Sequence, residues 1–140
     1  MQSSGREAAQ MARTIDLIDS ADLLREELER NPEFRERWER TALARAIAIA
    51  VIRYRSEHGL SQRALAKLLG MAYAQVARLE LGEHNPTVDT LQRLAKGLGT
   101  RFILEVAPPD RADEVVLPAG VEVLTDVTLA DGTRLLAAAG

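Results

Sequence analysis

The sequence predicts a mainly α-helical fold that ends in a short β-strand and hairpin segment. Through residues 14–98, apolar side chains recur at helical spacing and capping residues divide them into separate helices. After residue 100 the apolar residues alternate along the chain, which is typical of strands. The 140 residues are 46% hydrophobic and 28% charged, an ordinary balance for one globular domain with extensions.

The expected organisation has four parts. Residues 1–13 are polar and are predicted to form a disordered leader, and residues 14–40 form an N-terminal helical extension. Residues 41–100 form a helical domain, and residues 101–140 form a C-terminal β segment suited to dimerisation.

Two helices are expected in the first part of the chain. Ser20 is a suitable cap for a short helix that places three leucines on one face, Leu23, Leu24 and Leu28. The Asn31-Pro32 pair ends that helix and begins the next, with the asparagine as cap and the proline at the first helical position. No breaker follows before Gly59, so one continuous helix is predicted over residues 32–58. Its apolar run at 42–52 predicts deep burial.

Three shorter helices follow, at residues 61–69, 72–81 and 87–96. Ser61 and Thr87 are the expected caps, and Gly70 and Gly82 supply the turns between helices. The side chains expected to face inward are Leu65, Ala66, Leu68, Leu69, Val76, Leu79, Leu91, Leu94 and Ala95.

The C-terminal part is expected to be β structure. Residues 101–106 alternate as a strand, and Pro108-Pro109 ends it. Residues 121–129 alternate again, Asp131-Gly132 is a strong hairpin signal, and residues 133–137 form the return strand. The strand at 101–106 has an exposed edge unless it pairs with this hairpin or with a second chain.

Composition excludes several classes of function. The chain has no cysteine, and its two histidines are too few for a histidine-rich metal centre. It has no nucleophile elbow, phosphate loop or convincing carboxylate pair, so we expect neither enzyme activity nor a cofactor. No stretch is apolar enough to span a membrane, and the first residues lack the core of a secretory signal. A soluble, cytoplasmic protein is therefore expected.

The charge is unevenly distributed. The net charge is −3 for residues 1–40 (seven basic, ten acidic residues) and −4 for residues 101–140 (three basic, seven acidic). Between them, residues 41–100 carry +4, with eight basic and four acidic residues. A basic middle suits phosphate binding, and acidic flanks suit a basic protein partner or simply solubility.

Residues 60–98 carry the functional signal. Two short helices meet across a tight turn, and the small Ala66 permits their close approach. Val76 and Leu79 anchor the second helix on the core, which leaves its opposite face free. This is helix-turn-helix geometry, in which the second helix enters the DNA major groove.

The segment resembles the lambda-repressor/Cro superfamily, or XRE-type helix-turn-helix domains, over about residues 41–100. The matching positions are Leu60-Ser61-Gln62, Leu65-Ala66, Leu69-Gly70, Val76, Leu79-Glu80, Gly82, Pro86, Leu91, Leu94-Ala95 and Leu98-Gly99. The resemblance implies a lambda-repressor-like helix-turn-helix bundle that binds an operator in duplex DNA as a homodimer.

The family's DNA-contacting positions fall on Gln62, Arg63, Tyr73, Ala74, Gln75, Ala77, Arg78, His84, Asn85 and Thr87. Arg78 is the best candidate for a guanine, because its fork matches two acceptors on that base. Gln75 suits adenine, and Tyr73 suits a phosphate or a thymine methyl group. For each, the alternative is a solvated surface residue.

Arg55 and Glu80 match a pair that forms a buried salt bridge in related domains and fixes the angle of the reading helix. The alternative is two exposed charges. The sequence departs from the family at Ala72, which cannot cap the reading helix, and at Leu81, where a polar residue is common. Both departures remove expected DNA contacts and predict weaker DNA binding by each domain.

Over about residues 20–107 the chain also resembles HigA-like antitoxins of type II toxin–antitoxin modules. That resemblance implies autorepression and neutralisation of a small basic ribonuclease toxin of the RelE/HigB type. The expected toxin-docking residues are Leu23, Leu24, Leu28, Phe34 and Trp38, set among glutamates. The alternatives are that this region packs on its own domain or a second copy, that the protein is a stand-alone regulator, or that it is an adaptor with a vestigial DNA module.

Overall fold

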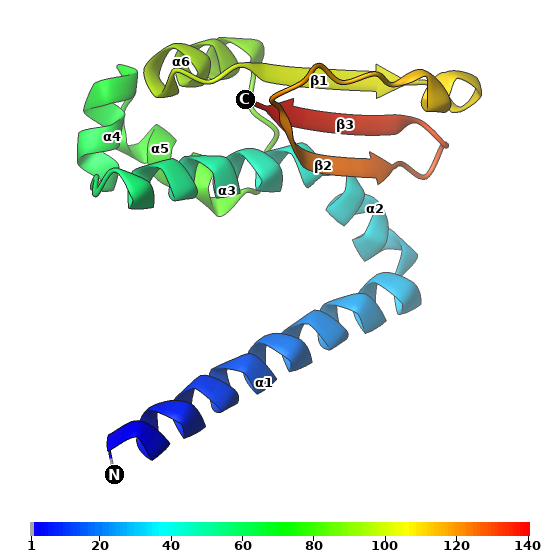
Figure 1. Ribbon diagram of the computed structural model, residues 1–140. Helices are drawn as coiled ribbons and strands as arrows, with labels where there is room; N and C mark the ends of the chain where they lie inside the picture. Colours follow the sequence, from blue (N-terminus) through cyan, green and yellow to red (C-terminus); the bar gives the residue numbers. More distant parts are fainter. Residues whose placement is uncertain (1) are drawn as a thin grey trace. The chain divides into compact units, whose positions relative to one another are not determined.

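The computed structural model describes the backbone of residues 2–140 and the side chains of residues 5–9 and 20–140. The chain is mainly helical and ends in a small three-stranded antiparallel sheet, so the predicted fold class is confirmed (Figure 1). It divides into two compact units, Met1–Arg37 and Trp38–Gly140.

The N-terminal unit contains α1 (Gln2–Arg30) and the start of α2 (Pro32–Arg40). The leader predicted over residues 1–13 is wrong from residue 2 onward, because α1 begins at Gln2. Residues 6–13 are mostly good helix formers, and the sequence analysis gave their polarity too much weight. The break at Asn31 is where it was expected, and Asn31 Oδ1 accepts a hydrogen bond from the Phe34 N–H at 3.1 Å as the cap of α2.

The helix predicted over residues 32–58 is not continuous. It is divided at Thr41 into α2 and α3 (Ala42–Glu57). The Trp38 carbonyl accepts hydrogen bonds from the Thr41 hydroxyl at 3.3 Å and from the Arg45 guanidinium at 2.5 Å. The same guanidinium lies 3.5 Å from the centroid of the Trp38 ring. Side chains therefore satisfy the end of α2, which lets the helix stop without a proline or glycine.

The core of the second unit forms around α3, as expected for its apolar run. Ile47 and Val51 are fully buried and pack with Leu65, Val76 and Leu94 from the shorter helices. The prediction of burial was too broad, however, because Ile49 and Ile52 are 56% and 40% exposed and Leu68, expected to face inward, is 50% exposed. These side chains lie on the outer faces of their helices, where the hydrophobic pattern continues past the surface that is covered.

Three short helices complete the helical part of this unit: α4 (Gln62–Leu69), α5 (Tyr73–Leu81) and α6 (Val88–Leu98). Ser61 and Thr87 cap α4 and α6 by accepting hydrogen bonds from the N–H groups of Ala64 and Thr90. The helices end at Gly70, Gly82 and Gly99, all in the left-handed conformation that glycine adopts at low cost.

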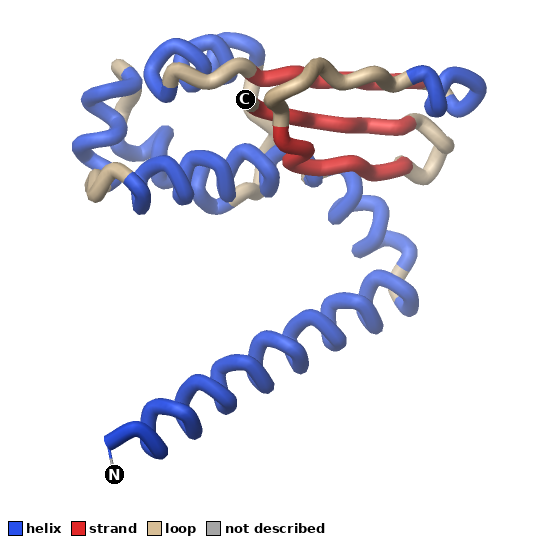
Figure 2. The backbone as a smooth tube through the Cα atoms, viewed as in Figure 1, coloured by secondary structure: helices blue, strands red, loops and turns tan. Residues whose placement is uncertain are grey.

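The sheet has the strand order β1-β3-β2, from β1 (Phe102–Ala107), β2 (Glu122–Thr128) and β3 (Arg134–Ala139). The hairpin turn lies at Asp131-Gly132, as expected, and the pairing of β1 with β3 meets the expectation that the first strand joins the hairpin. Figure 2 shows the connection running from the end of β1 through the short 3₁₀ helix η1 (Pro109–Glu114) and back to β2. The sequence analysis missed η1. Arg134 of β3 pairs with Asp126 of β2 at 2.7 Å and holds the pKa of that carboxyl below its ordinary value.

Candidate nucleic-acid interface

The site is built on α4 and α5, which are joined by a tight turn. Gly70, at φ 63°, ends α4, and the chain enters α5 two residues after Met71. Leu65, Leu69 and Val76 are buried between these helices and the core. Because one side of α5 is anchored in this way, its opposite side faces solvent as a rigid surface.

The outward side of α5 carries most of the predicted base-reading residues. Tyr73 is 44% exposed, Ala74, Gln75 and Arg78 are exposed, and Ala77 is half-buried. Within the described part of the chain, the Arg78 guanidinium makes no hydrogen bond or ion pair and is free to bind a ligand. The Arg63 guanidinium from α4 lies over the Tyr73 ring, 4.7 Å from its centroid, and so these two predicted contacts form one unit.

The first turn of α5 compensates for its missing cap. Ala72 occupies the cap position in extended conformation but has no side-chain acceptor. Instead, Gln75 Oε1 accepts a hydrogen bond from the Ala72 N–H at 3.0 Å. In this arrangement Gln75 offers only its amide N–H groups to DNA. The bidentate pairing with adenine that the sequence suggested requires this hydrogen bond to open.

This half-formed cap predicts that Ala72→Ser stabilises the protein. The backbone at residue 72 already has the φ and ψ of a capping residue, and a serine hydroxyl would accept from the Gln75 N–H. We expect the free energy of unfolding to rise by about 1 kcal/mol, measured by urea denaturation. Ala74→Ser, also exposed but inside the helix, is the control and should give no gain; equal changes in both variants would contradict the capping account.

Arg55, Glu80 and Gln62 form a network behind the recognition helix. Arg55 Nε donates to Glu80 Oε1 at 2.8 Å, and Gln62 Nε2 donates to Glu80 Oε2. The Glu80 side chain is 6% exposed and that of Arg55 is 28% exposed. The network joins α3, α4 and α5 and sets the orientation of α5. It also engages Gln62, which the sequence analysis assigned to a phosphate.

The loop after α5 borders the same surface. His84 is exposed and Thr87 caps α6, while the Asn85 side chain has a structural role that the sequence analysis did not identify. Asn85 Nδ2 donates to the Arg40 carbonyl at 2.8 Å, and Asn85 Oδ1 accepts from the Ala44 N–H at 3.0 Å. This amide therefore ties the loop to the junction of α2 and α3, a use that competes with a phosphate contact.

An open groove of about 310 Å³ lies between α5 and this loop. It is lined by Met71, Gln75, Arg78, Leu79, His84, Asn85, Pro86, Thr87 and Thr90. The structure thus brings together several predicted DNA contacts from two segments. Gln62, Arg63, Tyr73, Ala74 and Ala77 lie outside the groove lining.

Searches for other kinds of site were negative within the described residues. No group of three or more histidine, aspartate or glutamate side chains is placed to hold a metal ion. In the same part of the chain, no helix is both long enough and apolar enough to cross a membrane.

Comparison with known proteins matches this geometry. A helix-turn-helix family profile matches residues 51–103. The chain is 40% identical over 58 residues to the uncharacterized HTH-type transcriptional regulator y4dJ of Sinorhizobium fredii (strain NBRC 101917 / NGR234), covering 41% of this chain and 75% of that protein.

Two relatives from Escherichia coli (strain K12) are also similar. The chain is 34% identical over 70 residues to the HTH-type transcriptional regulator SutR, covering 50% of this chain and 39% of that protein. It is 33% identical over 60 residues to the HTH-type transcriptional regulator PuuR, covering 43% and 32%. The matched segment thus spans only about a third to two fifths of these two relatives, and no solved structure matches the chain.

Proposed function

Because the chain belongs to the XRE-type helix-turn-helix family of DNA-binding transcriptional regulators, we propose that it is a repressor that binds a specific operator as a homodimer. The observation that carries the proposal is the solvent-facing side of α5, which is rigidly anchored by Val76 and presents an unpaired Arg78. A helix held in this way enters the major groove by its N-terminal half.

Each part of the surface has a distinct role in the proposal. Arg78 reads a guanine through its planar fork. Tyr73 and Arg63, stacked on each other, contact the phosphate backbone beside the groove. His84 and the N-terminus of α6 contact a second phosphate across the groove. The net charge of +4 over residues 41–100 supplies the general attraction to DNA.

Selection of bound duplexes from a random pool tests this function. We expect the full-length protein to enrich one short, two-fold symmetric sequence, and we expect that sequence to occur upstream of its own gene. Binding should weaken steeply as salt rises, because phosphate contacts release counterions. Enrichment of no sequence at low salt would refute the proposal, and enrichment of an asymmetric site would refute its homodimeric form.

We further propose that the protein is a HigA-like antitoxin whose N-terminal helices hold a small basic toxin protein of the RelE/HigB type. The support is the surface of α1 and α2. Leu23 is 66% exposed, Leu24, Leu28 and Phe34 are half-buried, and glutamates surround them at residues 26, 27, 29, 33, 36 and 39. An acidic, partly apolar surface suits a basic partner. Trp38, also predicted here, belongs to the second unit, where its ring carries Arg45.

Charge reversal in the full-length chain tests the antitoxin proposal. Glu26→Lys combined with Glu29→Lys is expected to abolish neutralisation of a basic ribonuclease encoded beside this gene, measured as growth rescue on co-expression. Operator binding should be unchanged, because both residues lie in the N-terminal unit. Glu57→Lys, an exposed reversal on α3, is the control. Full rescue by the double variant, or a neighbourhood without such a ribonuclease, would leave the stand-alone regulator as the function.

A further inference from the structure

β1 is an edge strand whose outer side is unpaired within the part of the chain that the structure describes. The sheet order places β3 on one side of β1 and no strand on the other. At the start of the strand, Arg101 and Gly140 exchange two backbone hydrogen bonds, at 2.9 and 3.0 Å. Because such pairs alternate along an antiparallel ladder, Ile103 and Glu105 bond to β3. The N–H and C=O groups of Phe102, Leu104 and Val106 point to the open edge.

The side chains at this edge are apolar. Leu104 and Val106 share one face of the sheet and are 47% and 60% exposed. No charged residue lies on that face of β1, and the first proline comes after the strand, at Pro108. Proteins usually protect an edge with lysine, proline or a bulge, and β1 has none of these.

The opposite edge of the sheet differs in this respect. β2 contains an irregularity between Val123 and Thr125, and it carries the charged residues Glu122 and Asp126. A bulge of this kind disrupts the regular row of free backbone groups. The two edges are therefore unequal, and β1 is the one prepared for pairing.

We propose that β1 pairs antiparallel with β1 of a second copy of this chain, about a two-fold axis at Leu104. In this register Leu104 lies opposite the partner's Leu104, and Phe102 lies opposite the partner's Val106. Every outward N–H and C=O of these residues then finds a partner, and the exposed apolar side chains of both copies cover one another.

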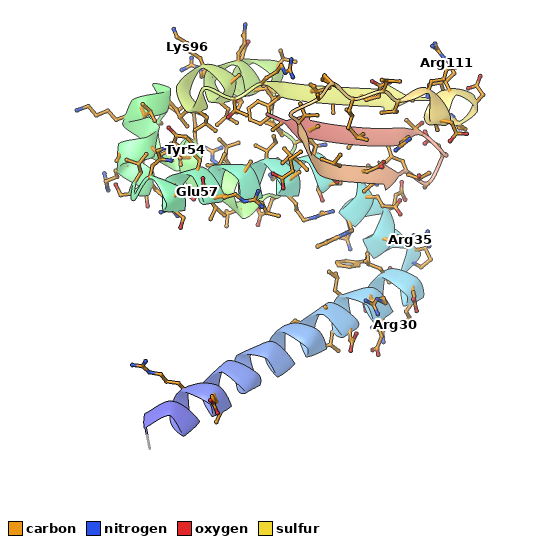
Figure 3. The ribbon with its side chains drawn as sticks, viewed as in Figure 1. Arg30, Arg35, Tyr54, Glu57, Lys96 and Arg111 are labelled. Atoms are coloured by element: carbon orange, nitrogen blue, oxygen red, sulfur yellow. The ribbon has the colours of Figure 1, made fainter. Side chains whose placement is uncertain are left out.

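Charge complementarity favours the same arrangement. Lys96 and Arg101 lie at the start of β1, whereas the η1 segment at its end has three carboxylates and one guanidinium, a net charge of −2. Figure 3 shows Lys96 and Arg111 at these two opposite ends. Antiparallel pairing places the basic end of each copy beside the acidic end of the other, so one two-fold contact satisfies both.

This inference deepens the homodimer proposed above and rests on it, but its test reads mass rather than DNA binding. We expect sedimentation equilibrium of the full chain, without DNA, to give twice the 15.4 kDa of one copy. Leu104→Lys should halve that mass by placing like charges face to face at the axis. Val123→Lys, equally exposed at 47% but on the other edge, should leave the dimer intact.

Leu104→Pro gives a second test. It removes an N–H that points to the open edge, so the fold should survive while the dimer is lost. Hydrogen exchange in the intact dimer should protect the amides of Leu104 and Val106, and dilution or Leu104→Lys should release them. The amides of Ile103 and Glu105, bonded to β3, should stay protected throughout. A monomeric parent chain, a dimer that survives both Leu104 variants, or unprotected Leu104 and Val106 amides in the dimer would overturn the proposal. Absent sequence-selective DNA binding by a proper β1 dimer would instead overturn only the proposed function.

Discussion

Arg55→Ala is expected to lower the free energy of unfolding by about 3 kcal/mol, a large share of the stability of a small domain. The substitution leaves the Glu80 carboxylate, 6% exposed, with Gln62 as the remaining side-chain partner shown for it. Glu80→Ala should be less damaging, at about 1–2 kcal/mol, because Arg55 is 28% exposed and reaches water. Urea denaturation followed by circular dichroism measures both effects.

A double variant separates the pair from its surroundings. Arg55→Leu together with Glu80→Leu removes both charges and should recover most of the stability lost in the single variants, because no uncompensated buried charge remains. Its DNA affinity should stay low, because the network that sets the angle of α5 is gone. Losses below about 1 kcal/mol in both single variants would show that the pair contributes no more than a surface ion pair.

Arg78→Ala is expected to weaken binding to the selected operator by about 10- to 100-fold, or about 1–3 kcal/mol, while binding to unrelated duplexes falls only a few-fold. The loss arises because the unpaired guanidinium on α5 is the group proposed to read a guanine. Fluorescence anisotropy at fixed salt, with both kinds of DNA, measures the two affinities.

Two further variants make this prediction specific. Arg78→Lys keeps the charge but loses the planar fork, so it should retain binding to unrelated DNA and still lose the preference for the operator. Arg25→Ala removes a charge from α1 in the other unit and should change neither affinity. If Arg78→Lys binds the operator as well as the parent chain, Arg78 contacts a phosphate instead of a base.

Much of the fold was predictable because its boundaries are encoded locally. Ser61 and Thr87 cap helices, and Gly70 and Gly82 end them, within a few residues of the positions that they control. The break at Thr41 was not predictable in this way. It depends on hydrogen bonds from the Arg45 side chain to the end of the preceding helix, and no proline or glycine marks it.

The outward face of the reading helix was predictable for a related reason. Residues that read DNA must project from a surface, and the buried positions of a short helix fix which residues remain outside. The role of Asn85 was not, since its partners Arg40 and Ala44 lie more than 40 residues away in sequence. Likewise, the use of Gln75 to cap its own helix followed from the loss of a capping side chain at Ala72, which the sequence analysis noted only as a defect.

The amide of Asn85 joins two mechanical elements that have different tasks. Its hydrogen bonds, at 2.8 and 3.0 Å, connect the last residue of α2 and the first turn of α3 to the loop that borders the groove beside α5. Tension applied to α2 by any bound protein is therefore delivered to the DNA-side loop through a single side chain. Such a linkage gives a partner of the N-terminal arm leverage over operator release without its touching the recognition helix.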